Sequence, residues 1–369
     1  MLINNKSYRT IWYDKSSESV KIIDQTKLPF KLEVISLKKA DDVIKAINEM
    51  KVRGAPLIGA TAAYGIFLAY RELKNKSKII DEAYKIKETR PTAINLFWAV
   101  DKMLSKIDCN VNIAKTEKIL FEEAKKICEN DINSCKKIGL NGLKIIKKFH
   151  KNKKEKVNIL THCNAGWLAT IDWGTATAPV YYAKKNNINV HVWVDETRPR
   201  NQGASLTSYE LNNEGVENTI ISDNTAGLLM QRGKIDLCIV GADRVTSNGH
   251  VANKIGTFMK AVMAREFNIP FYVAIPTSTI DWKIKKYQDI VIEERVGTEL
   301  SEITGLDNKN KIRKIKIYPS KSKVYNPAFD ITPSRFISAF ITDKGIIKAN
   351  YKEIARLKDE KVRKKKKNN

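Results

Sequence analysis

Five short apolar runs in the second half of the chain constrain its fold more than any other feature. They recur about every 20 to 35 residues with helical patterns between them, and they read VNILTHC, NVHVWVDE, NTIISDN, IDLCIVGAD and IPFYVAIPT. Continuous β-branched runs that alternate with helices are typical of a parallel sheet covered on both faces. The pattern therefore predicts a Rossmann-like, doubly wound α/β domain over residues 151–355.

The first part of the chain has a different rhythm. Strand-like runs, YRTIWYD, SVKIIDQ and KLEVISLK, come first, and helical patterns follow from DDVIKAINEMKVRG onward. In that first helical pattern the apolar residues Val43, Ile44, Ile47 and Met50 have helical spacing. We expect a mostly helical N-terminal domain with a small β-sheet over residues 1–150, and the charged stretch 151–156 reads as the joint between the domains.

The charge balance has two interpretations. Lys and Arg number 66 against 41 Asp and Glu, a net charge of +25, and such an excess is compatible with nucleic-acid binding. The excess is nearly all lysine spread along the chain, however, and no RNP-like aromatic motif or recognition-helix pattern accompanies it. We therefore expect no specific nucleic-acid partner, and residues 356–369, which end in KVRKKKKNN, are expected to form a disordered basic tail.

Several classes of protein do not fit the sequence. The apolar runs are too short to span a bilayer, and the N-terminal MLINNKSYRT lacks the apolar core of a signal peptide. The cysteines are odd in number and form no CxxC pair, which predicts a reduced, cytoplasmic protein without a disulfide framework. They are Cys109, Cys128, Cys135, Cys163 and Cys238. No zinc-binding pattern, GxGxxG or GxxxxGK[ST] occurs, so we expect no metal, nucleotide or other cofactor.

Polar side chains follow each of the five predicted strands. The groups are Thr161-His162-Cys163-Asn164, Asp195-Glu196-Thr197-Arg198, Ser222-Asp223-Asn224, Gly241-Ala242-Asp243-Arg244 and Pro276-Thr277-Ser278-Thr279. Because the carboxyl ends of parallel strands share one edge of a sheet, these residues predict a ligand site there. The alternative is that Asp195, Asp223 and Asp243 cap helices. We expect His162 to be structural, because it points to the face opposite Cys163 if the strand persists.

Two arginines in the helical part suggest an anion site. Arg53 in VRGAPLIG and Arg90 in TRPTAINL each come just before a helical pattern. Free amides at a helix start favour an anion, and an arginine adds a bidentate donor. Together with the polar edge of the sheet, they suggest a phosphate held between the two domains.

Several long motifs then carry a resemblance to a known family. They are RGAPLIGATAAYG, RPTAINLFWAV, ILTHCNAG, VDETRPRNQGASLTSYEL, VGADRVTSNGHVANKIGT and NPAFDITP, in this order. From about residue 8 to about residue 350, the chain closely resembles the methylthioribose-1-phosphate isomerases of methionine salvage. The wider superfamily, related to initiation factor 2B, includes ribose-1,5-bisphosphate isomerases and regulatory subunits of an initiation-factor complex, so a shared fold alone does not settle the activity.

The resemblance implies an aldose–ketose isomerase that converts 5-methylthioribose 1-phosphate into 5-methylthioribulose 1-phosphate. It implies that Cys163 and Asp243 are catalytic, that no cofactor is needed, and that the protein is a homodimer formed through the Rossmann-like half. The implied substrate contacts are Arg53, Gly54, Ala55, Arg90, Gln202, Asn253 and Lys254.

The chemistry explains why such residues are required. A phosphate on C1 locks the sugar ring, so an acid must protonate the ring oxygen before a hydrogen moves from C2 to C1. Burial would keep Asp243 protonated for this step, and amides of a helix beginning after Cys163 would favour its thiolate. Transfer as a proton and transfer as a hydride both stay open.

Two further alternatives stay open. Trp167, which follows THCNAG, either shapes the pocket for the C5 substituent or packs beneath the loop. The substrate is alternatively 5-deoxyribose 1-phosphate or ribose 1,5-bisphosphate, or the protein is a non-catalytic sugar-phosphate-binding subunit, which should lack the Cys and Asp pair.

Overall fold

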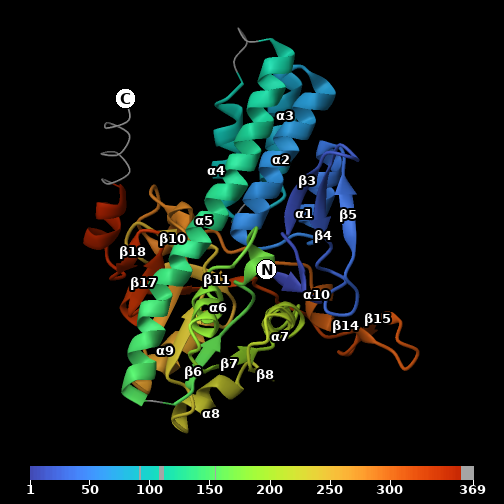
Figure 1. Cartoon of the computed structure of the whole chain (residues 1–369). Helices are drawn as coiled ribbons and strands as arrows, with labels where there is room; N and C mark the ends of the chain where they lie inside the picture. The colour runs from blue at the N-terminus through green and yellow to red at the C-terminus, as the bar shows by residue number, and fades with distance from the viewer. Residues whose placement is uncertain (91–92, 108–111, 154, 359–369) are drawn as a thin grey trace.

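A seven-stranded, mainly parallel sheet forms the base of the molecule (Figure 1). The computed structural model describes residues 1–90, 93–107, 112–153 and 155–358. The sheet has the order β18-β17-β12-β9-β6-β7-β8, in which only the edge strand β18 is antiparallel. Its strands are β6 (Val157–Thr161), β7 (Val190–Asp195), β8 (Asn218–Ile221), β9 (Leu237–Val240), β12 (Phe271–Ile275), β17 (Ala339–Thr342) and β18 (Gly345–Ile347). The five predicted strands are confirmed, whereas β17 and β18 had not been predicted.

The order of the strands reverses between β6 and β9. From β6 the chain builds outward through β7 and β8, and it then returns to β9 on the other side of β6. Ile159 lies opposite Leu237 and Leu160 opposite Cys238, so the two strands end side by side. Ligands of open α/β sheets bind at such a reversal, and here the two chains leaving it carry Cys163 and Asp243.

Helices cover both faces of this sheet, which confirms the doubly wound fold class. One face packs on α6 (Ala178–Lys185), α7 (Ser208–Asn213) and the second half of α5 (Ile113–Lys153). The other face packs on α8 (Thr225–Gln231) and α9 (Thr257–Glu266). Successive strand residues alternate between the two cores, as Ile159 and Leu160 do.

The N-terminal half combines a small sheet with a bundle of helices, as predicted. The sheet is antiparallel and contains β3 (Ile11–Asp14), β4 (Ser19–Ile23) and β5 (Val34–Leu37). The bundle contains α1 (Ala40–Asn48), α2 (Ala55–Leu73), α3 (Lys76–Glu88), α4 (Ile94–Leu104) and the first half of α5. The central helix α2 is buried along most of its length, so its start is held rigidly near the large sheet.

The long helix α5 belongs to both halves of the molecule. Its residues up to Ile132 pack in the N-terminal core, and those from Ile138 onward pack against the large sheet. The helix also continues to Lys153, so the beginning of the predicted joint is helical. The division at residue 150 stays a prediction, because one helix connects the two cores.

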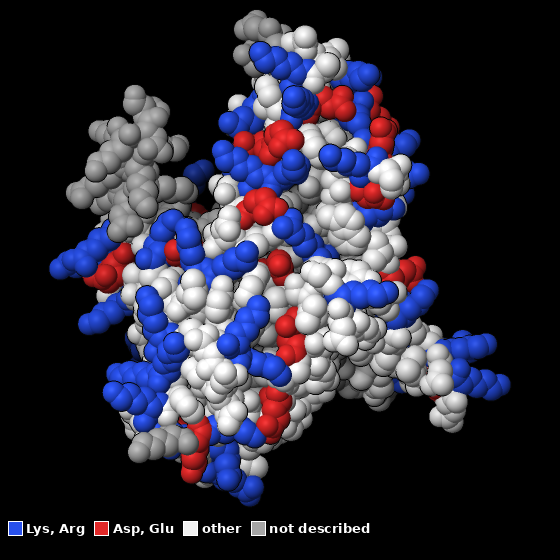
Figure 2. Space-filling model, in the orientation of Figure 1, with Lys and Arg blue, Asp and Glu red and all other residues white. Residues whose placement is uncertain are grey.

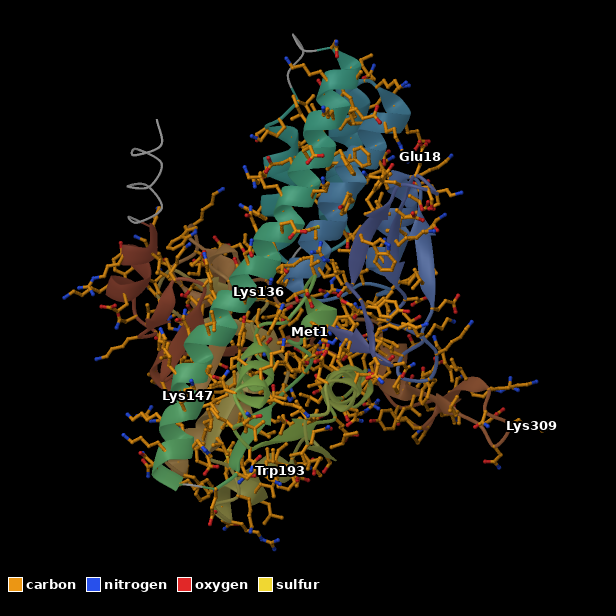
Figure 3. All side chains as sticks on the ribbon, in the orientation of Figure 1. Met1, Glu18, Lys136, Lys147, Trp193 and Lys309 are labelled. Carbon is orange, nitrogen blue, oxygen red and sulfur yellow. The ribbon has the colours of Figure 1, made fainter. Side chains whose placement is uncertain are left out.

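Shorter elements complete the fold. A four-stranded sheet has the order β13-β10-β11-β16, and a β14–β15 hairpin projects from the body; Figure 3 shows Lys309 at its tip. These strands and the N-terminal pair are β1 (Leu2–Ile3), β2 (Lys6–Ser7), β10 (Arg244–Thr246), β11 (Val251–Lys254), β13 (Ile280–Asp281), β14 (Glu302–Leu306), β15 (Ile312–Lys316) and β16 (Phe329–Thr332). The short helices are η1 (Trp167–Ala169), η2 (Gly203–Thr207), η3 (Thr277–Thr279), η4 (Tyr287–Asp289), α10 (Thr298–Ser301) and η5 (Ser334–Phe336).

The surface shows how the charge excess is distributed. Figure 2 shows Lys and Arg scattered over the visible face, with Asp and Glu between them rather than in a separate patch. Of the predicted basic tail, residues 356–358 are helical and residues 359–369 lie outside the described part of the chain. None of the helices that the structure describes is long and apolar enough to cross a membrane.

Candidate active site

A small cavity of about 30 Å³ lies where β6 and β9 end and α2 begins. Six residues predicted for the site line it: Arg53, Gly54, Ala55, Cys163, Asp243 and Asn253. Gln202 instead lines a second, larger cavity of about 970 Å³, which shares Arg53 with the first. Arg90 and Lys254 lie close enough to Asp243 to influence its charge. The structure thus brings the predicted residues into one region, in which Arg53 lines both cavities and Gln202 only the larger one.

Cys163 has an unusual backbone conformation. Its φ is 66°, in the left-handed region that non-glycine residues rarely adopt at no cost. Its N–H donates to Thr197 Oγ1 at 2.8 Å, and its carbonyl accepts from Thr207 Oγ1 at 2.7 Å. Hydroxyls from the segment after β7 therefore hold the residue in this conformation.

No α-helix begins directly after Cys163, so the expectation that helix-start amides favour its thiolate is wrong. The chain forms only the short 3₁₀ turn η1, and α6 starts later, at Ala178. Trp167 in this turn is fully buried in the core beside the large sheet and lies outside the cavity wall. It packs beneath the loop, and this supports the second of the two interpretations of Trp167.

Arg53 holds this loop against the start of α2. One terminal nitrogen donates to Asn164 Oδ1 at 2.6 Å, and the other donates to the Asn164 carbonyl at 3.0 Å and lies 3.6 Å from Cys163 Sγ. Gly54 has a φ of 87°, and a Cβ there would come within 2.6 Å of Ala169. The close approach requires glycine, and it places the guanidinium beside the thiol.

Asp243 combines burial with several basic neighbours. Burial raises the pKa of its carboxyl, while the charges of Lys254, Arg90 and Arg53 oppose the rise. Burial likewise lowers the pKa of Lys254, partly offset by Cys163 and Asp243. A thiol, a carboxyl and an amine therefore share one buried region, where their charges interact strongly.

Arg90 is a buried cation of this region with unused donors. Its side chain is buried, and its Nε and Nη1 have no hydrogen-bond partner among the described residues. Glu293 Oε2 lies 3.5 Å from Nε, and burial lowers the pKa of Arg90. A buried guanidinium with unused donors is suited to bind a phosphate or carboxylate.

Asn253 and Lys254 come from strand β11, which pairs with β16. Asn253 Nδ2 donates to Thr257 Oγ1 at 3.0 Å, and Lys254 Nζ lies 5.0 Å from the centre of the Phe329 ring. Gln202 stands before η2, and its buried Oε1 has no partner in the described structure. Asn253 and Lys254 are therefore held by contacts with α9 and β16, whereas Gln202 Oε1 remains available to a ligand.

Sequence reasoning missed the acidic and basic residues after η4. Arg295 donates to Glu293 at 2.6 Å and to Glu299 at 2.8 Å, and its charge also acts on Arg90 and Lys254. The only signal in the sequence is the charged run EER in a segment without a regular pattern. Such a run normally indicates a solvated loop, so it gave no reason to expect a partly buried ion network.

His162, Asp195 and Asp223 lie together on the other side of the β6 tip. Their ligand atoms fall within 4.8 Å of one another, which is a possible metal geometry. Protein groups already fill the positions, however: His162 contacts Asp195 Oδ2 at 2.9 Å and the Ile255 carbonyl at 2.8 Å, and Lys260 Nζ lies 3.2 Å from Asp195 Oδ2. We therefore assign no metal to them.

The aspartates do not cap helices as the alternative supposed. Asp223 accepts the N–H groups of Thr197 and Arg198, both at 2.8 Å. Asp195 binds His162, and Asp243 precedes strand β10 rather than a helix. Asp223 and Asp195 instead hold neighbouring segments together, and Asp243 lines the small cavity.

Comparison with known proteins gives consistent results. Residues 51–349 match the initiation factor 2 subunit family. A methylthioribose-1-phosphate isomerase of Sulfurimonas denitrificans is 50% identical over 353 residues, which cover 94% of this chain and 98% of that protein. The crystal structure of 5-methylthioribose 1-phosphate isomerase from Pyrococcus horikoshii has a TM-score of 0.81 and 37% identity, covering 96% of each chain. That of initiation factor eIF-2B subunit delta from A. fulgidus has a TM-score of 0.76 and 39% identity, covering 95% of this chain and all of that one (100%).

Proposed function

Since this chain belongs to the initiation factor 2 subunit family and, within it, to the methylthioribose-1-phosphate isomerases, we propose that it converts 5-methylthioribose 1-phosphate into 5-methylthioribulose 1-phosphate. It is an aldose–ketose isomerase of methionine salvage. The observation that carries the proposal is that Cys163 and Asp243 line one cavity at the reversal of strand order.

Asp243 is the proposed acid. The ring oxygen of a 1-phosphorylated sugar needs a proton before the ring opens, and burial raises the pKa of Asp243, which favours the protonated form that can supply it. Cys163 is placed to assist the hydrogen transfer from C2 to C1. With Lys254 near both groups, charge that develops during the transfer meets a nearby amine in a buried site.

The remaining predicted residues would bind the substrate. Arg90 has unused donors for the C1 phosphate, while Asn253, Lys254 and Gln202 present amides and an amine for the phosphate or the sugar hydroxyls. Gly54 and Ala55, at the start of α2, would add backbone N–H groups for an anion. Such positioning supplies on the order of 7–11 kcal/mol in the best cases.

The experiment is a product assay on 5-methylthioribose 1-phosphate, 5-deoxyribose 1-phosphate and ribose 1,5-bisphosphate. We expect the first to have the highest kcat/KM. We also expect Cys163→Ala and Asp243→Asn each to lower kcat at least about 100-fold, as loss of general acid–base catalysis does.

Two outcomes would contradict the proposal. A preference for another compound would reassign the substrate. The absence of any turnover would favour a non-catalytic sugar-phosphate-binding subunit, a reading that the similarity to the A. fulgidus protein keeps relevant.

We also propose a homodimer formed through the Rossmann-like half. Support comes from exposed apolar side chains on neighbouring elements of that half: Ile220 on β8, Leu228 on α8, and Met259 and Val262 on α9. The cytoplasm is the proposed location, in keeping with the free thiols of Cys128, Cys135, Cys163 and Cys238.

A further inference from the structure

A buried glutamate that the proposed reaction does not use lies behind the Cys163 loop. Glu210 on α7 is fully buried, and its two oxygens accept four hydrogen bonds. One oxygen accepts from Asn164 Nδ2 and from the Leu168 N–H, both at 2.9 Å. The other accepts from the Trp167 N–H at 3.0 Å and from the Tyr181 hydroxyl at 3.1 Å. The carboxylate therefore organises the whole turn that follows Cys163.

Gly166 leaves the space that this carboxylate occupies. A Cβ on Gly166 would lie 1.6 Å from Glu210 Oε2, so no other residue fits there without moving the glutamate. Burial raises the pKa of Glu210 to about 7, while Asn164 and the other donors oppose the rise. Such a costly group inside a core calls for a role beyond packing.

Asn164 connects this carboxylate to Arg53. Its Nδ2 donates to Glu210, and its Oδ1 accepts from an Arg53 terminal nitrogen at 2.6 Å. Because an ionised carboxylate only accepts hydrogen bonds and a guanidinium only donates them, Glu210 and Arg53 together fix the orientation of the Asn164 amide between them. The other terminal nitrogen of Arg53 then lies 3.6 Å from Cys163 Sγ.

We propose that Glu210 and Asn164 are positioning residues, which hold the Arg53 guanidinium against Cys163 and so stabilise its thiolate. A fixed positive charge within about 4–6 Å of an acidic group favours its ionised form. Arg53 thereby supports the thiol as well as the substrate. The catalytic consequence rests on the proposed function, whereas the effect on the thiol does not.

The direction in which the Cys163 titration midpoint moves when Glu210 is neutralised distinguishes this proposal from a direct effect of the Glu210 charge on the thiol. Above about pH 7 Glu210 is itself negative, so its charge acting directly on Cys163 would disfavour the thiolate. Removal of that charge would then move thiolate formation to lower pH. If Glu210 acts through Asn164 and Arg53, its removal moves thiolate formation to higher pH instead.

The experiment is a titration of the Cys163 thiolate by ultraviolet absorbance, in which each protein is compared with its own Cys163→Ala counterpart. We expect Arg53→Gln and the uncharged change Asn164→Ala each to raise the midpoint by about one pH unit, the low end of such charge effects. Glu210→Gln should raise it in the same direction. In the double variant Arg53→Gln/Asn164→Ala, the midpoint should rise no further than in Arg53→Gln alone, because both changes remove one contact.

Kinetics and a matched control complete the test. The variants that raise the Cys163 titration midpoint should shift the pH profile of kcat in the same direction. The control Glu123→Gln should leave the profile unchanged. Glu123 is also buried, but it pairs with Lys102 at 2.6 Å in the N-terminal half. Thermal unfolding shows which variants are folded.

The outcomes are distinct. An unchanged midpoint in folded Asn164→Ala, or a lower midpoint in Glu210→Gln, would overturn the proposal. The titration needs no substrate. If the variants show the expected shifts of the Cys163 midpoint but the protein does not isomerise the sugar, only the proposed function is contradicted.

Discussion

Arg90 illustrates what a single side chain contributes to this site. Its buried Nε and Nη1 lack partners in the part of the chain that the structure describes, and a phosphate would supply acceptors for them. We predict that Arg90→Lys raises KM for the sugar phosphate about 10- to 100-fold, because a charge-assisted hydrogen bond of about 1.5–3 kcal/mol is lost. Steady-state kinetics measures this change.

The matched control is Arg9→Lys. Arg9 is exposed and pairs with Glu129 at 2.5 Å on the surface, so its replacement should leave KM unchanged. An Arg90→Lys enzyme with normal KM and altered kcat would place Arg90 near the reacting carbons rather than at the phosphate.

At this scale the sequence indicates some roles and hides others. Cys163 could be picked out because it is the cysteine that stands at the end of a predicted strand. Glu210 could not, because it lies in a helical pattern where a glutamate is normally solvated. The link from Glu210 to Arg53 exists only after folding, since it joins α7, the loop after β6 and the start of α2.

Among the elements, α5 carries a titratable group in its buried face. Asp131 accepts the Ile171 N–H at 3.1 Å, and burial raises its pKa to about 7 from an ordinary value of 3.8. Between about pH 4 and pH 7, Asp131 is therefore protonated in the folded protein and ionised in the unfolded chain. The stability contributed by this proton is present below pH 4 and is lost as the pH rises through 7.

We predict that Asp131→Asn flattens the dependence of unfolding free energy on pH in this window. A shift of this size corresponds to at most about 4 kcal/mol, and we expect about half, because the side chain is only partly buried. Denaturant unfolding at pH 5 and pH 8 measures it. Glu210 and Asp330, with pKa values raised to about 7 and about 6, titrate in the same range and should leave a residual slope. An unchanged slope in Asp131→Asn would show that Asp131 is ionised throughout.

The sequence predicts an element when the pattern within that segment is sufficient to identify it. The five strands from β6 to β12 that were predicted are flanked by helical patterns and read as continuous apolar runs. Strands β10, β11 and β16 are only three or four residues long; β10 and β11 pair across a short turn, and their further pairing with β13 and β16 joins segments that are distant in the sequence. Pattern alone cannot reveal such pairings, which depend on tertiary context.

For the whole molecule, the exposed apolar face on α8 and α9 bears on assembly. We predict that the protein sediments as a dimer and that Met259→Glu makes it a monomer at micromolar concentration, because a charge placed in an apolar interface is costly. Met259 is 49% exposed in the single chain. Tyr84→Glu is the control, since Tyr84 is 62% exposed on α3, in the other half. A dimer that persists in Met259→Glu would place the interface elsewhere.

The sequence did not predict in detail how the two halves are placed relative to each other. The polar strand ends and the two arginines suggested that a site lies between domains, and six of the predicted residues do line one cavity. The sequence did not reveal that α5 belongs to both cores. A helical pattern shows which face is apolar but does not identify the elements that pack against each turn.

This shared helix has a consequence for anyone who divides the gene. A fragment that ends before α5 would expose the apolar flank of α2, and one that begins after it would expose the apolar side chains of α6 and the large sheet that α5 covers. Expressed separately, the two pieces should aggregate; co-expressed, with the cut placed beyond Lys153, they should reassemble into an active enzyme.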